Sequence, residues 1–152
     1  MQRIKGLIGV DTYQNIEHVY TKEQVNKLLE EYQVNFPEAM HRNVKSMFKP
    51  DSNPDLVEKV TADMSAVLPR IALEIARAFM EPKLNLAQVL DKVKTPIHCI
   101  ASDREIIDIE VTLRHVSSFE VSYMSDVGHF VMIEDPDTFN RLINEIFNEF
   151  VS

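Results

Sequence analysis

The sequence predicts an α/β fold with about three parallel strands, flanking helices and an all-helical insertion. Three short apolar runs bounded by turn residues have the length of strands. They cover residues 4–10, 97–101 and 120–124. Helical patterns separate the runs, and the pattern over residues 109–115 suits the crossover that two parallel strands need.

The first run is nearly continuous in apolar and glycine residues from Ile4 to Val10. Strands that are buried on both faces have this composition, because neither face meets water. The run begins almost at Met1, whereas buried central strands rarely open a domain. We therefore expect the chain to begin in the middle of a fold.

The last helix has the clearest pattern in the chain. Its apolar residues recur at alternating spacings of three and one, which places them in one stripe along a helix. They are Phe139, Leu142, Ile143, Ile146, Phe147 and Phe150. Asp135 and Pro136 mark its start, since proline suits the first turn of a helix.

The long segment between the first two strands consists of helical patterns separated by turn residues. These patterns cover residues 21–32, 36–48, 55–68, 69–80 and 86–93, and Thr21 is placed to cap the first. A helical insertion between strands of a parallel sheet is typical of a lid over a site at the strand ends. We therefore expect a core of residues 1–12 and 95–152, with a helical cap or lid over residues 13–94.

Composition and charge argue against several classes of protein. The chain has 152 residues, enough for one domain, and its 45% hydrophobic and 26% charged residues are the balance of an ordinary globular protein. The net charge of −8 argues against nucleic-acid and anionic-membrane partners, which need a basic face. No apolar run has the length of a membrane span, and the short stretch before the first strand is not expected to act as a signal peptide.

The single cysteine, Cys99, cannot form an internal disulfide, which fits a reducing compartment. Together with the lack of a signal peptide, this predicts a cytoplasmic location. Cys99 lies inside the second apolar run. It is therefore expected to be a small buried side chain and not a reactive thiol.

Two residues near the predicted strand ends could carry chemistry. Asp103 follows the second strand, and His129 follows the third in the sequence Gly128-His129-Phe130. The carboxyl ends of parallel strands are where α/β sheets place their sites. A carboxylate there can orient an imidazole and stabilise the imidazolium that forms when the other ring nitrogen takes a proton. We therefore predict His129 as a catalytic base and Asp103 as its partner, and expect the nearby Asp126 to be a solvated turn residue.

From Arg3 to its C-terminus the chain resembles the second half of an α/β-hydrolase. Residues 4–12 resemble the sixth strand of that fold, and residues 95–103 resemble the seventh strand with its catalytic acid. Residues 126–130, followed by Glu134-Asp135-Pro136, resemble the histidine loop and the entry to the last helix. The helical segment resembles the cap. The resemblance implies an ester or acyl hydrolase that uses Asp103 and His129 with a serine nucleophile.

The chain also departs from the family pattern. The family's nucleophile lies in a Gly-x-Ser-x-Gly elbow, whereas the only glycines here are Gly6, Gly9 and Gly128. The family's oxyanion-hole loop is missing as well. The seventh strand has Ala101 and Ser102 where the family commonly has a glycine, which leaves Asp108 as an alternative acid.

Two functions follow from the resemblance and its departures. In the first, the chain is the C-terminal portion of a hydrolase, inactive alone, whose substrate would be a small ester or acyl compound once a nucleophile is supplied. In the second, it is a non-catalytic self-associating or binding module derived from a truncated hydrolase. The first strand would then expose an edge, so we expect a homo-oligomer formed through that edge or by exchange of the helical segment.

The remaining histidines and serines are expected to be structural. His18, His41, His98 and His115 lack the mutual spacing of metal ligands, so neither a metal nor another cofactor is expected. Ser102, Ser117, Ser118 and Ser125 lie near the predicted site without the strained elbow that activates a serine.

Overall fold

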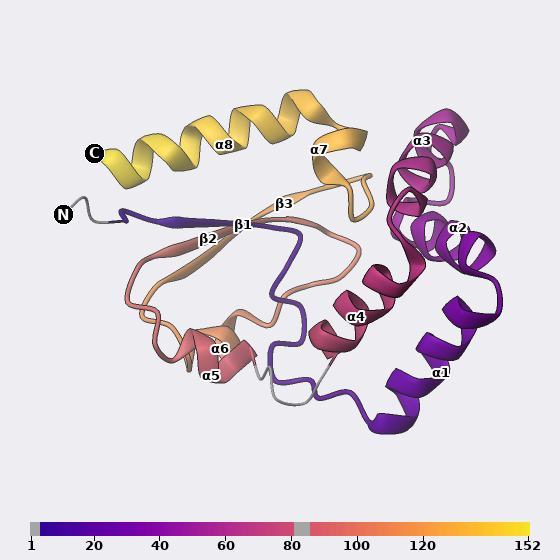
Figure 1. Ribbon diagram of the computed structural model, residues 1–152. Helices are drawn as coiled ribbons and strands as arrows, with labels where there is room; N and C mark the ends of the chain where they lie inside the picture. The colour runs from indigo at the N-terminus through magenta and orange to yellow at the C-terminus, as the bar shows by residue number, and fades with distance from the viewer. Residues whose placement is uncertain (1–3, 81–85) are drawn as a thin grey trace. The chain divides into compact units, whose positions relative to one another are not determined.

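The structure is a computed structural model that describes residues 4–80 and 86–152 (Figure 1). The chain divides into two compact units. The sheet unit consists of Met1–Glu17 and Leu86–Ser152, and the helical unit of His18–Asn85. The helical unit is shorter at both ends than the predicted insertion, because Tyr13, Ile16, Leu90 and Val93 pack with the sheet.

The three predicted strands form one parallel sheet, which confirms the predicted fold class. Strands β1 (Leu7–Val10), β2 (Ile97–Ser102) and β3 (Phe119–Met124) lie in the order β1-β2-β3. β1 is shorter than the predicted run over residues 4–10, since its ladder begins where Leu7 N donates to Pro96 O (2.9 Å). Over the described residues, β1 and β3 are the two edges of the sheet.

Alternate side chains of the sheet enter two hydrophobic cores, one on each face. Helix α8 (Pro136–Val151) covers one face, where the buried residues are Ile100, Met124, Val127, Val131 and Ile146. Helices α5 (Leu86–Leu90) and α6 (Ile109–Leu113) lie on the other side of the sheet (Figure 1). The core on that side contains Ile97, Cys99, Ala101 and Phe119, and Cys99 is fully buried as predicted.

Helix α8 confirms both the predicted amphipathic pattern and the predicted start. Asp135 caps it, because its Oδ1 accepts a hydrogen bond from Thr138 N (3.1 Å). The apolar stripe packs on the sheet, except that Phe147 at its margin is 58% exposed. One further helical turn, α7 (Val131–Glu134), precedes α8.

The helical unit contains α1 (Lys22–Val34), α2 (Phe36–Met47), α3 (Pro54–Ser65) and α4 (Pro69–Met80). These helices occupy the predicted segments, and Thr21 caps α1 by accepting a hydrogen bond from Gln24 N (3.2 Å). Helices α1 and α4 pack together through Val25, Leu29 and Met80. Across residues 4–80 and 86–152, no helix combines the length and the apolar character that crossing a membrane requires.

Candidate active site

A histidine and a carboxylate meet at the carboxyl ends of the strands. His129 follows β3, and Asp11 is the first residue after β1. The imidazole Nδ1 and the Asp11 Oδ2 lie 2.6 Å apart. The histidine side chain is 47% exposed and the aspartate side chain only 7%. The pair therefore combines a buried, oriented acid with an imidazole that solvent can reach.

Backbone and side-chain donors hold the Asp11 carboxylate in place. Its Oδ1 accepts a hydrogen bond from Ser102 N at the end of β2 (2.8 Å) and another from Gln14 Nε2 (3.3 Å). The backbone N of Asp11 donates to Ile100 O (2.7 Å), which extends the ladder between β1 and β2. Oδ1 is thus held by hydrogen bonds from Ser102 and Gln14, and Oδ2 faces His129.

The turn that presents Asp11 has an unusual backbone. Asp11, Tyr13 and Asn15 have φ values of 41°, 74° and 50°, in the left-handed region that side chains other than glycine disfavour. The Tyr13 ring packs edge-on against Phe119, with ring centroids 5.5 Å apart. Left-handed conformations outside glycine persist only where surrounding contacts impose them, and they cluster at functional sites.

The loop that carries His129 is tied to its surroundings on both sides of the histidine. Ser102 Oγ donates to Val127 O (2.7 Å), and Gly128 N donates to the Glu134 carboxylate (2.6 Å). The first bond joins the loop to β2, and the second joins it to α7. Because both of these anchors lie close to the histidine, the backbone of His129 has little freedom to leave Asp11.

The electrostatics of the pair favour a protonated imidazole. The hydrogen bond to Asp11 raises the pKa of His129 above its usual value near 6.5, partial burial opposes this, and the charges of Asp11 and Glu105 raise it further. When the imidazole is neutral, Nδ1–H donates to Asp11, and Nε2 makes no hydrogen bond with the residues that the structure describes. The pair can therefore accept a proton from a nearby hydroxyl group or water, as a general base does.

Removing the carboxylate charge should lower the pKa of His129. In Asp11→Asn the imidazole loses its anionic partner, so its titration midpoint should fall towards or below 6.5. The midpoint can be measured from the imidazole resonances in a pH series by nuclear magnetic resonance. Asp103→Asn is the matched control and should leave the midpoint unchanged, so a larger shift in that variant would assign the histidine to Asp103.

The carboxylate that lies at His129 Nδ1 is Asp11 and not the predicted partner, Asp103. Asp103 is exposed, and its backbone N continues the sheet by donating to Met124 O (3.1 Å). The residue that contacts His129 is Asp11, which the sequence interpretation assigned to the strand end without a role. The rule that selected Asp103, an acid directly after a strand, applies equally to Asp11. The catalytic roles of His129 and Asp103 stay predictions.

The other acidic candidates have different contacts. The Asp108 carboxylate caps α6 by accepting a hydrogen bond from Val111 N (3.0 Å). Asp126 is exposed and has a left-handed backbone (φ 60°), as suits a turn residue. Asp108 is therefore engaged at a helix N-terminus and not with His129.

The remaining histidines and the cysteine have structural contacts. His98 Nε2 lies 2.9 Å from Ser122 Oγ, and His115 lies between the carboxylates of Asp91 and Glu17. Burial raises the pKa of Cys99 to about 11, which keeps it a thiol. Within the described parts of the chain, no three histidine, cysteine, aspartate or glutamate residues are grouped so that they could hold a metal ion.

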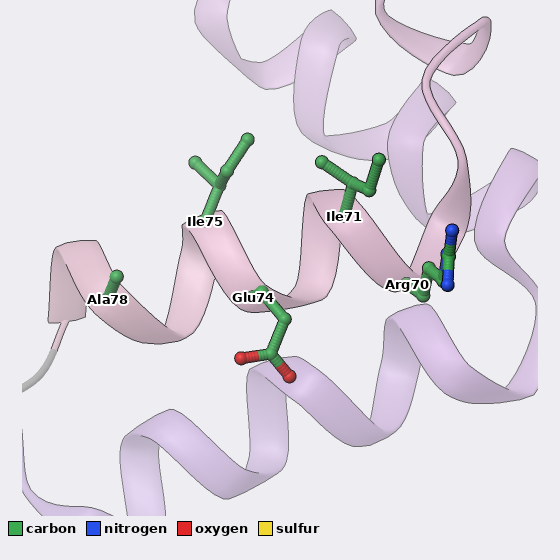
Figure 2. Close-up of a pocket in the computed structure, with 5 residues that line it drawn as sticks. All are labelled: Arg70, Ile71, Glu74, Ile75 and Ala78. Atoms are coloured by element: carbon green, nitrogen blue, oxygen red, sulfur yellow. The ribbon is translucent and has the colours of Figure 1, made fainter.

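A pocket also lies on the helical unit, along α4. It is lined by Arg70, Ile71, Glu74, Ile75 and Ala78. Figure 2 shows Ile71 and Ile75 projecting from the same side of the helix and Glu74 from another side. The two isoleucines are 42% and 62% exposed, so α4 has an apolar face outside its contact with α1. Neither a histidine nor a serine is among the residues that line this pocket.

Comparisons with known proteins find similarity in structure but not in sequence. Neither the protein-family models nor the curated proteins include a match to this sequence.

Solved structures match nearly the whole chain at low identity. A thermophilic esterase from Thermogutta terrifontis matches 97% of the chain with a TM-score of 0.74 and 16% identity. A bromoperoxidase from Bacillus anthracis matches 97% with a TM-score of 0.74 and 13% identity. MGS-M2, described as an alpha/beta hydrolase enzyme from a Medee basin deep-sea metagenome library, matches 93% with a TM-score of 0.68 and 17% identity. The chain spans only 57%, 59% and 55% of these three structures, respectively.

Proposed function

We propose that the chain, which has the fold of part of an α/β-hydrolase, is the portion of an ester or acyl hydrolase that supplies the histidine and the acid. His129 is the general base in this proposal, and Asp11 is the acid that orients it. The hydrogen bond of 2.6 Å between Nδ1 and the buried carboxylate is the observation that carries the proposal. Esterases among the structures with this fold support the substrate class.

The proposed chemistry needs a nucleophile from outside these 152 residues, because they contain no Gly-x-Ser-x-Gly elbow. A nucleophilic hydroxyl would transfer its proton to His129 Nε2 while its oxygen attacks the carbonyl carbon of the ester. Asp11 would stabilise the resulting imidazolium, which then returns the proton to the departing alkoxide. We therefore propose that the chain is inactive by itself.

A short-chain chromogenic ester tests this proposal. The purified chain should release the chromophore no faster than its His129→Ala variant, because neither a serine elbow nor an oxyanion hole is supplied. The rates are compared at equal protein concentration and corrected for the reaction in buffer. Turnover by the unmodified chain that disappears in His129→Ala would show that the chain is a working hydrolase.

The alternative function is a non-catalytic module that associates with itself or with another protein. β1 supports this alternative, because over the described residues it pairs only with β2 and leaves its other side as a sheet edge. Such an edge presents unpaired backbone donors and acceptors to a second strand. A cytoplasmic location, suggested by the single cysteine, is part of both proposals.

Association through β1 should make the purified chain larger than 17.5 kDa in solution. Multi-angle light scattering over a range of concentrations measures the mass directly. Replacing Ile8 by proline removes a backbone donor from the edge strand and should shift the population towards the monomer. A monomer at every concentration in the unmodified chain would contradict the proposed association.

A further inference from the structure

A second histidine lies at the place where the sheet unit connects to the helical unit. His115 follows α6, and its side chain is only 18% exposed. Its Nδ1 lies 2.8 Å from Asp91 Oδ1, and its Nε2 lies 3.1 Å from Glu17 Oε1. Both ring nitrogens are thus engaged by carboxylates from other segments of the same unit.

The two carboxylates mark both connections of the sheet unit. Glu17 is its last residue before the chain continues into the helical unit. The chain re-enters the sheet unit at Leu86, and Asp91 follows directly on α5. One imidazole therefore joins the segment by which the chain leaves the sheet unit to the segment by which it returns.

The contact depends on the protonation state of the ring. An imidazolium has two N–H donors and can donate to both carboxylates, whereas a neutral imidazole has one donor and leaves a lone pair facing the second carboxylate. We propose that protonated His115 is a pH-dependent clamp that holds together the two segments connecting the sheet unit to the helical unit. This inference does not depend on the function proposed for His129.

The charges around the ring favour the protonated, clamped form. The hydrogen bonds to Asp91 and Glu17, in that order, raise the pKa of His115 above its usual value near 6.5. Lys94 lies beside this cluster, where its ammonium donates to the backbone O of Asp91 (3.2 Å). Because the folded-state pKa is raised, the clamp is fully formed below the usual pKa and is lost as the pH rises through the folded value.

Two measurements on the intact chain test the clamp. The first is the titration midpoint of His115, followed by nuclear magnetic resonance in the unmodified chain and in Glu17→Gln and Asp91→Asn. The midpoint should lie above 6.5 in the unmodified chain and fall in each variant. A His115 titration midpoint at its usual value, which neither substitution changes, would overturn the proposal.

The second measurement is amide hydrogen exchange, corrected for the intrinsic effect of pH. The amides of Asp91, Lys92 and Val93 donate to backbone oxygens of α5, so they report on the returning segment. Above the midpoint of His115, or in His115→Gln, they should exchange at least about threefold faster than in the clamped form.

His41→Gln provides the matched control, because His41 lies on α2 with Glu58 as its ion-pair partner (3.7 Å). This control should not alter exchange at the three amides. Equal corrected exchange rates below and above the pH of the His115 titration midpoint would contradict the clamp, even if that midpoint is raised.

Discussion

Asp11→Ala is expected to destabilise the chain by about 2–5 kcal/mol. The carboxylate accepts a hydrogen bond from Ser102 N at the buried end of β2, and alanine leaves that donor without this partner. An unsatisfied buried donor costs about 1–3 kcal/mol by itself. Loss of the bond to His129 adds to this cost, and alanine also fits a left-handed φ of 41° less well than aspartate does.

Two other substitutions separate these causes. Asp11→Asn keeps an oxygen acceptor for Ser102 N and tolerates the left-handed backbone, so it should lose less stability than Asp11→Ala. Asp103→Ala is the matched control, because Asp103 is exposed and its main-chain hydrogen bond survives the change. It should remain within about 0.5 kcal/mol of the unmodified chain.

Urea unfolding measures the free energy of unfolding of the three variants. The unmodified chain should also show a pH dependence that Asp11→Asn reduces. The pKa of His129 is raised in the folded state. The pair therefore contributes stability that is present below about pH 6.5 and is lost as the pH rises through the pKa of the folded state. If Asp103→Ala were as destabilising as Asp11→Ala, the buried carboxylate would not have the structural role argued for it.

The regular elements of the sheet unit could be predicted because their patterns are local. Strand composition identifies β2 and β3, and the apolar spacing with Asp135-Pro136 identifies α8. The limit of β1 was harder to predict. Residues 4–6 resemble the rest of the strand, but the ladder starts only where Leu7 meets Pro96.

The carboxylate that pairs with His129 could not be predicted from local patterns. Asp11 and Asp103 each follow a strand, and the sequence does not tell which carboxylate turns towards His129. That choice depends on the left-handed turn through Asp11 and Tyr13 and on the amide of Ser102, which lies far from Asp11 in sequence. These are tertiary features, and neither periodicity nor residue spacing encodes them.

The apolar stripe of α4 shows a second limit of periodicity. Ile71, Ile75 and Phe79 recur every four residues along α4, yet all three are exposed. The face that packs with α1 contains Leu73, Ala76 and Met80 instead. A helix with apolar residues on two faces fits either orientation, so its pattern predicts the helix but not which face is buried.

Ile100→Ala is expected to destabilise the sheet unit strongly. Ile100 is fully buried on the central strand β2, where it packs with Ile146 of α8 and with Met124 of β3. Truncating such a side chain removes apolar contacts and leaves a cavity that the surrounding strands cannot close, at a cost of about 2–5 kcal/mol. Domains of this kind are stable by about 5–15 kcal/mol in total, so the loss is a large share of the available stability.

The matched control for this truncation is Ile106→Ala, which removes the same atoms from a side chain that is 69% exposed. Its cost should stay below about 0.5 kcal/mol, because those atoms already contact water in the folded state. Urea unfolding of both variants gives the comparison, provided that the slope of the unfolding free energy against urea concentration is unchanged. Equal stability of the two variants would mean that the face of β2 beneath α8 does not form a hydrophobic core. Since that core supports the strand ends at which Asp11 and His129 meet, the candidate site would then lack the rigid support it needs.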